Sequence, residues 1–198
     1  AISAAKPLLR VGILLDHWMV SAWVSEVLAS VQTSGVAQLT TVVLNQDPEA
    51  INPRRSLRLR DLLSPTFTGT FLWRLYTRVD SALRPHLTAP FEPVDVRPLL
   101  AEAKRIDVTP IRSASANRFR PGDLEAVRKE KLDVILAFGF DGLRGDILEA
   151  ATYGVWSIHH GDNRRYRGGP AGFWEMYDEN PLTGTVLKFS TGGVRDAT

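Results

Sequence analysis

The sequence predicts an α/β protein whose open, mostly parallel sheet is covered by helices on both faces. Three observations predict this class: an apolar run of strand length near the start, a helical stretch and a second β-rich run after it, and a renewed alternation in the C-terminal half. Continuous apolar runs are typical of buried parallel strands, and alternating strands and helices build doubly wound sheets. We expect one domain over residues 1–198, a length sufficient for a single core.

The start of the chain has the pattern of a β-α-β unit. Leu8–Asp16 is a continuous apolar run, and from Met19 to Val31 the apolar residues recur at helical spacing. Gly35 then offers a helix stop, and Leu39–Asn45 is rich in strand-forming residues. We therefore expect a strand, a helix and a second strand that lies parallel to the first.

Residues 46–104 interrupt this alternation and are rich in proline and arginine. Within them, apolar residues at helical spacing predict one amphipathic helix over 70–84. We interpret the whole range as an insertion that packs on the domain. Its arginines suit phosphate or carboxylate ligands, and a solvated surface with some ion pairs explains them equally well.

Regular alternation returns in the second half of the chain. We expect strands at 106–111, 132–140, 155–160 and 183–190, and helices at 123–131, 143–151 and 169–177. Ligands of open α/β sheets bind beyond the carboxyl ends of the strands. The residues after Phe138 and after Ile158 are therefore the first candidates for a binding site.

Composition excludes several function classes. The chain has no cysteine, so it has no disulfide, thiolate metal site or catalytic cysteine, and we expect a cytoplasmic setting. A net charge of +2 does not favour nucleic acid as a partner. No apolar run approaches the roughly 20 residues that span a bilayer, and the opening residues lack a signal-peptide pattern, so we expect no membrane partner.

Four motifs follow one another in the region 132–198. They are Ala137-Phe138-Gly139 at a strand end, His159 on the next strand, Arg167-Gly168 with Pro170 in a loop, and Thr183-Gly184-Thr185 before the last strand. Their order and spacing resemble the core of the methionyl-tRNA, glycinamide-ribonucleotide and sugar N-formyltransferases. The loop HHGDNR followed by RGGPAGFWE is similar to a variant branch of this formyltransferase family. The resemblance implies a Rossmann-like formyltransferase fold.

The resemblance also implies transfer of a formyl group from 10-formyltetrahydrofolate to a primary amine. It assigns His159 the role of proton relay, for which an imidazole suits neutral pH. The family has asparagine two residues earlier, where this chain has Ser157, and the two side chains share one face of a strand. Asp196 corresponds to the family's third, acidic member, although a solvated loop acid explains it almost as well.

Position along the chain gives candidate binding residues. For the folate co-substrate, the resemblance implies the strand end Phe138, Gly139, Phe140 and Asp141. For the acceptor, we expect contacts from the following loop, whose arginines suit phosphate: His160, Asp162, Asn163, Arg164, Arg165, Arg167 and Gly168. A small amine, with nucleotide sugars among the candidates, is the expected partner, and the oligomeric state is left open.

Alternatives follow from the same residues. His159, His160 and Asp162 suggest a metal site, but adjacent strand side chains diverge, so we expect no metal. A serine offers fewer hydrogen-bond donors than asparagine, so the chain is alternatively a catalytically impaired binding or regulatory domain of a larger protein. Because family domains continue beyond the acidic loop, the resemblance implies either a short domain or further residues after Thr198.

Overall fold

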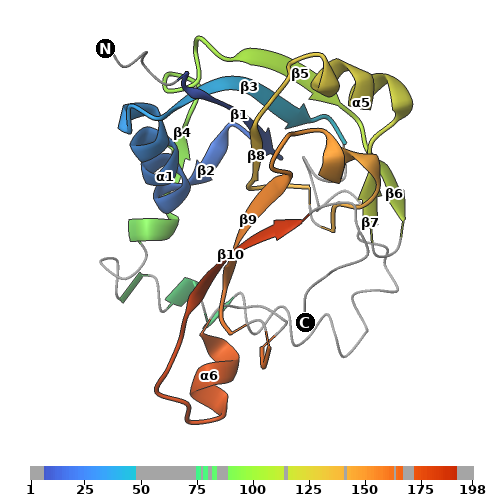
Figure 1. Ribbon diagram of the computed structural model, residues 1–198. Coiled ribbons are helices and arrows are strands. Elements are labelled where there is room, and N and C mark those ends of the chain that lie inside the picture. Colours follow the sequence, from blue (N-terminus) through green and yellow to red (C-terminus); the bar gives the residue numbers. More distant parts are fainter. Residues whose placement is uncertain are drawn as a thin grey trace, which may run out of the picture.

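The computed structural model describes residues 7–47, 75–76, 78–79, 82–83, 89–113, 116–140, 142–162, 164–166 and 172–190. Within them a six-stranded sheet has the order β10-β9-β8-β1-β3-β5 (Figure 1). Its strands are β1 (Leu9–Leu15), β3 (Ala37–Asn45), β5 (Lys104–Val108), β8 (Val134–Ala137), β9 (Val155–His160) and β10 (Thr185–Ser190). All run parallel except β10, which pairs antiparallel with β9. The predicted open, mostly parallel sheet is confirmed.

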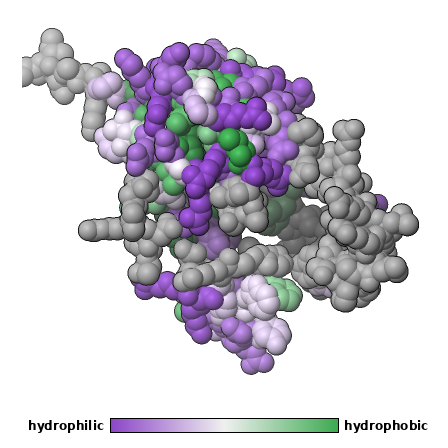
Figure 2. All heavy atoms as spheres, turned by 90° about the vertical axis from the view of Figure 1, so that its right-hand side faces the viewer, coloured by the Kyte–Doolittle hydropathy of each residue, from purple (hydrophilic) through white to green (hydrophobic). Residues whose placement is uncertain are grey.

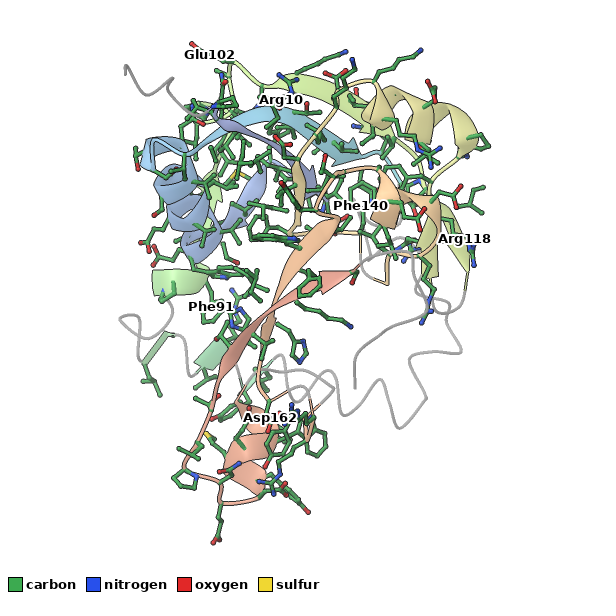
Figure 3. The ribbon with its side chains drawn as sticks, viewed as in Figure 1. Arg10, Phe91, Glu102, Arg118, Phe140 and Asp162 are labelled. Carbon is green, nitrogen blue, oxygen red and sulfur yellow. The ribbon has the colours of Figure 1, made fainter. Side chains whose placement is uncertain are left out.

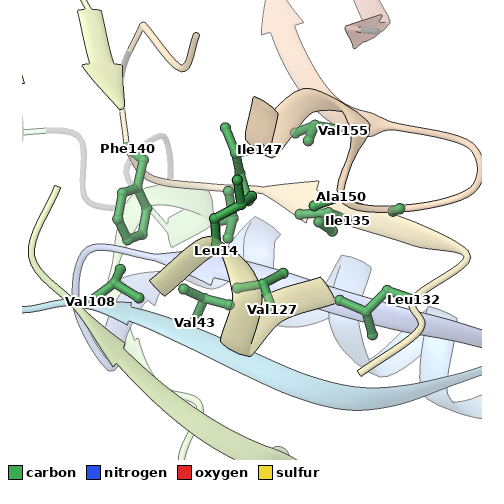
Figure 4. Close-up of a cluster of buried hydrophobic side chains, with 12 residues drawn as sticks. Leu14, Val43, Val108, Val127, Leu132, Ile135, Phe140, Ile147, Ala150 and Val155 are labelled. Carbon is green, nitrogen blue, oxygen red and sulfur yellow. The ribbon is translucent and has the colours of Figure 1, made fainter. Parts of the chain in front are cut away.

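Helices cover both faces of the sheet, as predicted. On one face, α1 (Ala22–Thr33) inserts Val24 and Leu28 into an apolar cluster with β1 and β3. On the other face, α5 (Pro121–Arg128) contributes Leu124 and Val127 to a second cluster. Figure 4 shows this second cluster, in which the α5 side chains meet those of the central strands. The sheet is therefore buried from both sides, which explains why its central strands are continuous apolar runs.

The helix predicted at Met19–Val31 begins three residues late. Met19–Ser21 forms the strand β2, which pairs antiparallel with β4 (Pro93–Asp95). The helix α1 then runs from Ala22 to Thr33. The partner strand β4 lies more than seventy positions further along the chain, so local periodicity could not reveal the pairing. The tertiary contact overrides the helical pattern at these three residues.

Two further elements differ from the prediction. The helix expected at 143–151 is only a single 3₁₀ turn, η4 (Asp146–Glu149), because Gly142 and Gly145 take positive φ angles of 67° and 82° that a helix excludes. The strand expected at 106–111 ends with β5 at Val108, and after Pro110 a short hairpin follows, made of β6 (Ile111–Ser113) and β7 (Ala116–Arg118). Proline lacks the N–H that would continue the ladder.

The proline-rich range 46–104 is described only in part. Residues 75–76, 78–79 and 82–83, inside the predicted amphipathic helix, are helical and exposed. After the short turn η3 (Ala89–Phe91) and β4, Val96 and Leu100 are buried in the cluster beneath α1, and β5 starts at Lys104. The last dozen residues of the range therefore belong to the sheet and core of the domain.

Viewed from the side of α5, hydrophilic side chains predominate and apolar ones gather in a small area between them (Figure 2). Among the described residues, no helix is long and apolar enough to cross a membrane.

The predicted helix at 169–177 is described from Gly172 onward, where α6 (Phe173–Tyr177) follows a left-handed Gly172 with φ of 76°.

Candidate functional site

The strand order reverses between β1 and β8. From β1 the sheet grows through β3 to β5 on one side, and through β8 to β9 on the other. In open α/β sheets, a ligand binds in the crevice at such a switch point, beyond the carboxyl ends of the strands. Here β1 ends next to Asp16 and β8 ends next to Phe138 and Gly139. Two of the four predicted folate-binding residues therefore lie at the switch point.

Asp16 links the ends of three strands. Its Oδ1 accepts a hydrogen bond from Asn45 Nδ2 at 2.7 Å, at the end of β3, and another from the backbone N–H of Phe140 at 3.2 Å, just after β8. Gly139 passes so close that a Cβ atom there would lie 2.6 Å from the backbone N of Asp16. The glycine of the Ala-Phe-Gly motif is therefore required by backbone contact with the end of β1.

Phe140, predicted to bind folate, has its side chain in the core. The ring is only 1% exposed and lies 5.3 Å from the ring of Phe119, between centroids. The residue takes a φ of 60°, which a bulky side chain rarely adopts and which the surrounding core holds in place. The side chain of Phe140 is therefore part of the core, and only its main chain can contact a ligand.

The strands β9 and β10 extend beyond the rest of the sheet as a two-stranded ribbon. β8 pairs with β9 only as far as Ser157, which lies beside Ala137. β10 continues the pairing to the end of β9, so that His159 faces Val186 and His160 faces Thr185 across the ladder. Ser157 therefore lies at the switch-point crevice, and both histidines lie on the ribbon beyond it.

Ser157 and His159 are half-buried on β9. The Nε2 atom of His159 lies 3.5 Å from the backbone oxygen of Tyr166. If Nε2 carries the ring proton, it donates to this carbonyl, and Nδ1 is then the atom that can accept a proton. Among the described residues, no hydrogen bond joins Ser157 to His159.

His160 contacts the opposite side, at α1. Its ring lies 5.1 Å from the ring of Trp23 in an edge-to-face arrangement, and the same indole lies 5.8 Å from the ring of Phe138. His160 Nδ1 is also 3.4 Å from Thr185 Oγ1. The two neighbouring histidines therefore have separate surroundings. In the part of the chain that the structure describes, no group of three or more metal-binding side chains occurs.

A pocket of ≈ 350 Å³ lies between α1, β2 and the ends of β1, β8 and β9. Its lining is mostly apolar and aromatic, with Asp16 as its carboxylate and His17 and His160 as its imidazoles. Among the described residues, the lining consists of Asp16, His17, Met19, Val20, Ser21, Trp23, Val24, Ala137, Phe138, Ile158 and His160. Small-molecule sites commonly combine such apolar walls with a few polar groups. Phe138 and His160 are the predicted site residues that the pocket brings together.

The loop after His160 forms a tight turn. Asp162 Oδ1 accepts from the backbone N–H of Arg164 at 2.9 Å, and the Asp162 carbonyl oxygen accepts from the N–H groups of Arg165 and Tyr166. The side chains of Arg164 and Arg165 are exposed, with the Arg165 guanidinium 5.7 Å from the centre of the Tyr166 ring. Figure 3 shows Asp162 beside α6, well away from Phe140. The turn that carries Asp162, Arg164 and Arg165 thus lies apart from Phe140, whereas Phe138 and His160 line one pocket.

The sequence patterns did not single out two contributors to this region, Asp16 and Glu175. Glu175 on α6 is 4% exposed, and its Oε1 accepts from Thr183 Oγ1 at 3.4 Å. A Cβ atom at Gly161, where φ is 105°, would come within 3.1 Å of the same oxygen. Asp16 could have been found by applying the strand-end rule to the first strand as well. Glu175 was not singled out because the sequence predicted only that it lies in a short helix, next to Phe173 and Trp174.

Five predicted site residues lie outside the described residues. They are Asp141, Asn163, Arg167, Gly168 and Asp196. Asp196 as the acidic partner of His159, and the remaining loop contacts, stay predictions.

The arrangement of the strands is that of a formyltransferase-like α/β fold, and solved structures share it. Glycinamide ribonucleotide transformylase 1 from Symbiobacterium toebii is similar with a TM-score of 0.53 and 14% sequence identity, over 94% of this chain and 68% of that one. Formyltetrahydrofolate deformylase from Burkholderia mallei is similar with a TM-score of 0.51 and 11% identity, over 95% of this chain and 50% of that one. At these identities the likeness establishes the fold.

Comparisons of sequence alone give no such relation. No family model matches the chain, and no curated protein matches it. The chain spans about two thirds of the length of the transformylase and half that of the deformylase. The resemblance of the four motifs therefore agrees with the fold, while the variant branch of the family stays a prediction.

Proposed function

We propose that the protein transfers a formyl group from 10-formyltetrahydrofolate to the primary amine of a small acceptor. The observation that carries the proposal is the position of His159 within a formyltransferase-like fold. It lies on β9, two residues after Ser157, which adjoins the switch-point crevice. A histidine next to a ligand crevice can exchange protons near neutral pH, as amine acylation requires.

The proposed reaction proceeds through a tetrahedral intermediate. The amine nitrogen attacks the formyl carbon and forms the new C–N bond, and the carbonyl oxygen becomes an oxyanion. The bond from that carbon to N10 then breaks, which yields a formamide and tetrahydrofolate. One proton leaves the amine, and N10 takes up one proton, so His159 serves as the relay. The hydroxyl of Ser157 and the protonated ring of His159 are candidate donors to the oxyanion.

Support for the two substrates comes from separate parts of the site. One similar structure is named for formyltetrahydrofolate and the other for glycinamide ribonucleotide. For the co-substrate we propose the main chain of Phe138, Gly139 and Phe140, together with Asp141. For a phosphate or nucleotide portion of the acceptor we propose Arg164 and Arg165, whose side chains are exposed on the turn after β9, with Arg167.

The test is release of tetrahydrofolate from 10-formyltetrahydrofolate in the presence of a panel of amines, amino sugars and nucleotide-linked amino sugars. Turnover is expected with at least one acceptor, and His159→Asn should lower its rate by about a hundred- to ten-thousandfold while folate still binds. Thr152→Ala, an exposed position at the other end of the strands, is the matched control and should keep the wild-type rate. Failure of the whole panel, with no folate binding by calorimetry, would reject the proposal.

A second candidate function rests on Ser157. Because serine carries one hydroxyl donor where the family has a carboxamide, the domain is alternatively a folate-binding module with little transfer activity. Ser157→Asn separates the two. Strong activity that appears only in this variant favours the module, whereas wild-type turnover that depends on His159 favours the enzyme.

A further inference from the structure

A second pocket, of ≈ 430 Å³, lies along α5 on the face of the sheet opposite to α1. Three arginines from separate segments line it: Arg118 at the end of β7, Arg128 in the last turn of α5, and Arg144 shortly before η4. We call it the arginine pocket. Figure 3 shows Arg118 on the side of the molecule away from α1. None of the described residues predicted to bind folate or the acceptor lines this pocket, so it is distinct from the pocket beside Trp23.

Two of the three guanidinium groups are held next to each other by the backbone. The N–H of Asn117 donates to the Gly142 carbonyl at 3.0 Å, and the Asn117 carbonyl accepts from the N–H of Arg144 at 3.1 Å. This pairing places Arg118 beside Arg144, and Arg118 Nη1 would lie 3.4 Å from a Cβ atom at Gly145. Neighbouring like charges repel each other, and an anion bound between them would offset the repulsion.

The arginines of this pocket have no protein partner in the part of the chain that the structure describes. All three are exposed, and none of them forms an ion pair or a side-chain hydrogen bond there. By contrast, Arg97, Arg105 and Arg112 each pair with an aspartate. The donors of the arginine pocket are therefore available to a ligand.

A phosphate group suits two adjacent guanidinium groups better than a carboxylate does. A guanidinium carries its N–H donors in a planar fork, and a phosphate monoester has three terminal oxygens, so two forks can bind one phosphate at once. A carboxylate has two oxygens, which a single fork can occupy. Arg118 and Arg144 therefore favour a phosphate monoester.

Two carboxylates in the lining limit what else the ligand can carry. Glu125 and Asp146 line the pocket, and neither forms an ion pair with a described arginine or lysine. They would repel a chain of several phosphates, and they can accept hydrogen bonds from hydroxyl groups. Phe119 and Leu124 add apolar surface, and the volume is within the range of small-molecule sites. The lining thus suits one phosphate on a hydroxyl-bearing ring.

We infer that the arginine pocket binds a phosphate monoester of a hydroxyl-bearing molecule, either a nucleoside monophosphate or a sugar phosphate. The phosphate lies between Arg118 and Arg144, and Arg128 is a third donor from α5. The hydroxyl groups of the ligand face Glu125 and Asp146. This site is additional to the proposed function and does not depend on it, because binding is measured without formyl transfer.

Calorimetry at constant ionic strength compares phosphorylated ligands with counterparts that lack the phosphate. The pairs are adenosine monophosphate with adenosine, uridine monophosphate with uridine, and ribose 5-phosphate with ribose, and inorganic phosphate is the probe of the anion alone. At least one ester is expected to bind about tenfold more tightly than its counterpart, because hydrogen bonds between ionised groups are strong. Binding of a nucleotide without ribose 5-phosphate supports a nucleoside monophosphate, and binding of both supports a sugar phosphate.

Matched variants place the ligand in the pocket. The double variant with Arg118→Gln and Arg144→Gln should lower the affinity for the ester by about tenfold. The control carries Arg120→Gln and Lys129→Gln, which remove the same charge from the two ends of α5 but do not line the pocket. Its affinity should change by less than about twofold, because solvent and salt screen exposed charges that do not touch the ligand. In NMR spectra of the wild type, the amide signal of Gly145 should shift when the ester is added.

Several results would overturn the inference. These are an equal affinity for every ester and its counterpart, an inorganic phosphate that binds as tightly as the best ester, wild-type affinity in the double variant at Arg118 and Arg144, and a Gly145 signal that does not shift. Because the NMR titration uses the wild-type protein, it decides the question even if the double variant does not fold.

Discussion

The contact between Gly139 and Asp16 joins the two strand ends that form the crevice. A Cβ atom at residue 139 would lie 2.6 Å from the backbone N of Asp16 and 2.8 Å from its Cγ, distances at which atoms overlap. Backbone atoms on one side and the hydrogen-bonded carboxylate on the other leave little room for adjustment. The position therefore requires glycine because of steric contact.

Gly139→Ala should destabilise the protein by about 1–3 kcal/mol, since the strand ends must move apart. Urea denaturation followed by circular dichroism measures this change. The matched control is Gly122→Ala in α5, where an added Cβ meets nothing within 4 Å and alanine favours the helix by up to about 1 kcal/mol. A loss at residue 139 no larger than that at residue 122 would contradict the steric explanation.

At the scale of elements, the ribbon of β9 and β10 contrasts with the central strands. From Ile13 to Leu15, β1 is fully buried, between β3 and β8. By contrast, β10 is an edge strand whose residues 185–189 are all exposed. Strands with few buried contacts open locally without unfolding of the whole domain. The candidate histidines lie on β9, at the end that pairs with this exposed strand.

Native-state hydrogen exchange should reveal this contrast. The amides of β1 are expected to exchange only through global unfolding, so that their apparent free energy matches that from denaturation. The amides of β10 should exchange with a clearly lower free energy. Binding of a folate analogue at the proposed crevice site should slow exchange in the ribbon. Equal protection of β10 and β1 in the unliganded protein would show that the ribbon is as rigid as the core.

At the scale of the whole molecule, the site is assembled by the sheet topology. More than a hundred residues separate Asp16 from Phe138 in the chain. These two residues and His160 meet in one pocket because three parallel strands end at the same edge of the sheet. The helix α1 then covers one side of this edge with Trp23.

The sequence by itself determined the class of fold and the placement of Ser157 and His159 on one strand. Its apolar runs identified the strands of the sheet because strands buried on both faces need continuous apolar residues. The spacing of Ser157 and His159 placed both on one strand, as the structure has them. These features depend on neighbours in the chain, so they can be derived from local pattern.

Only the tertiary structure decided which distant groups meet. Because β2 pairs with β4, the helix predicted from Met19 begins only at Ala22. The helix predicted at 143–151 is a single 3₁₀ turn because Gly142 and Gly145 take positive φ angles. The burial of Phe140 removed its side chain from the predicted folate site, and Asp16 and Trp23 entered a pocket beside His160. Apart from the glycine turn, each outcome depends on contacts between segments far apart in the chain, and periodicity carries no information about such contacts.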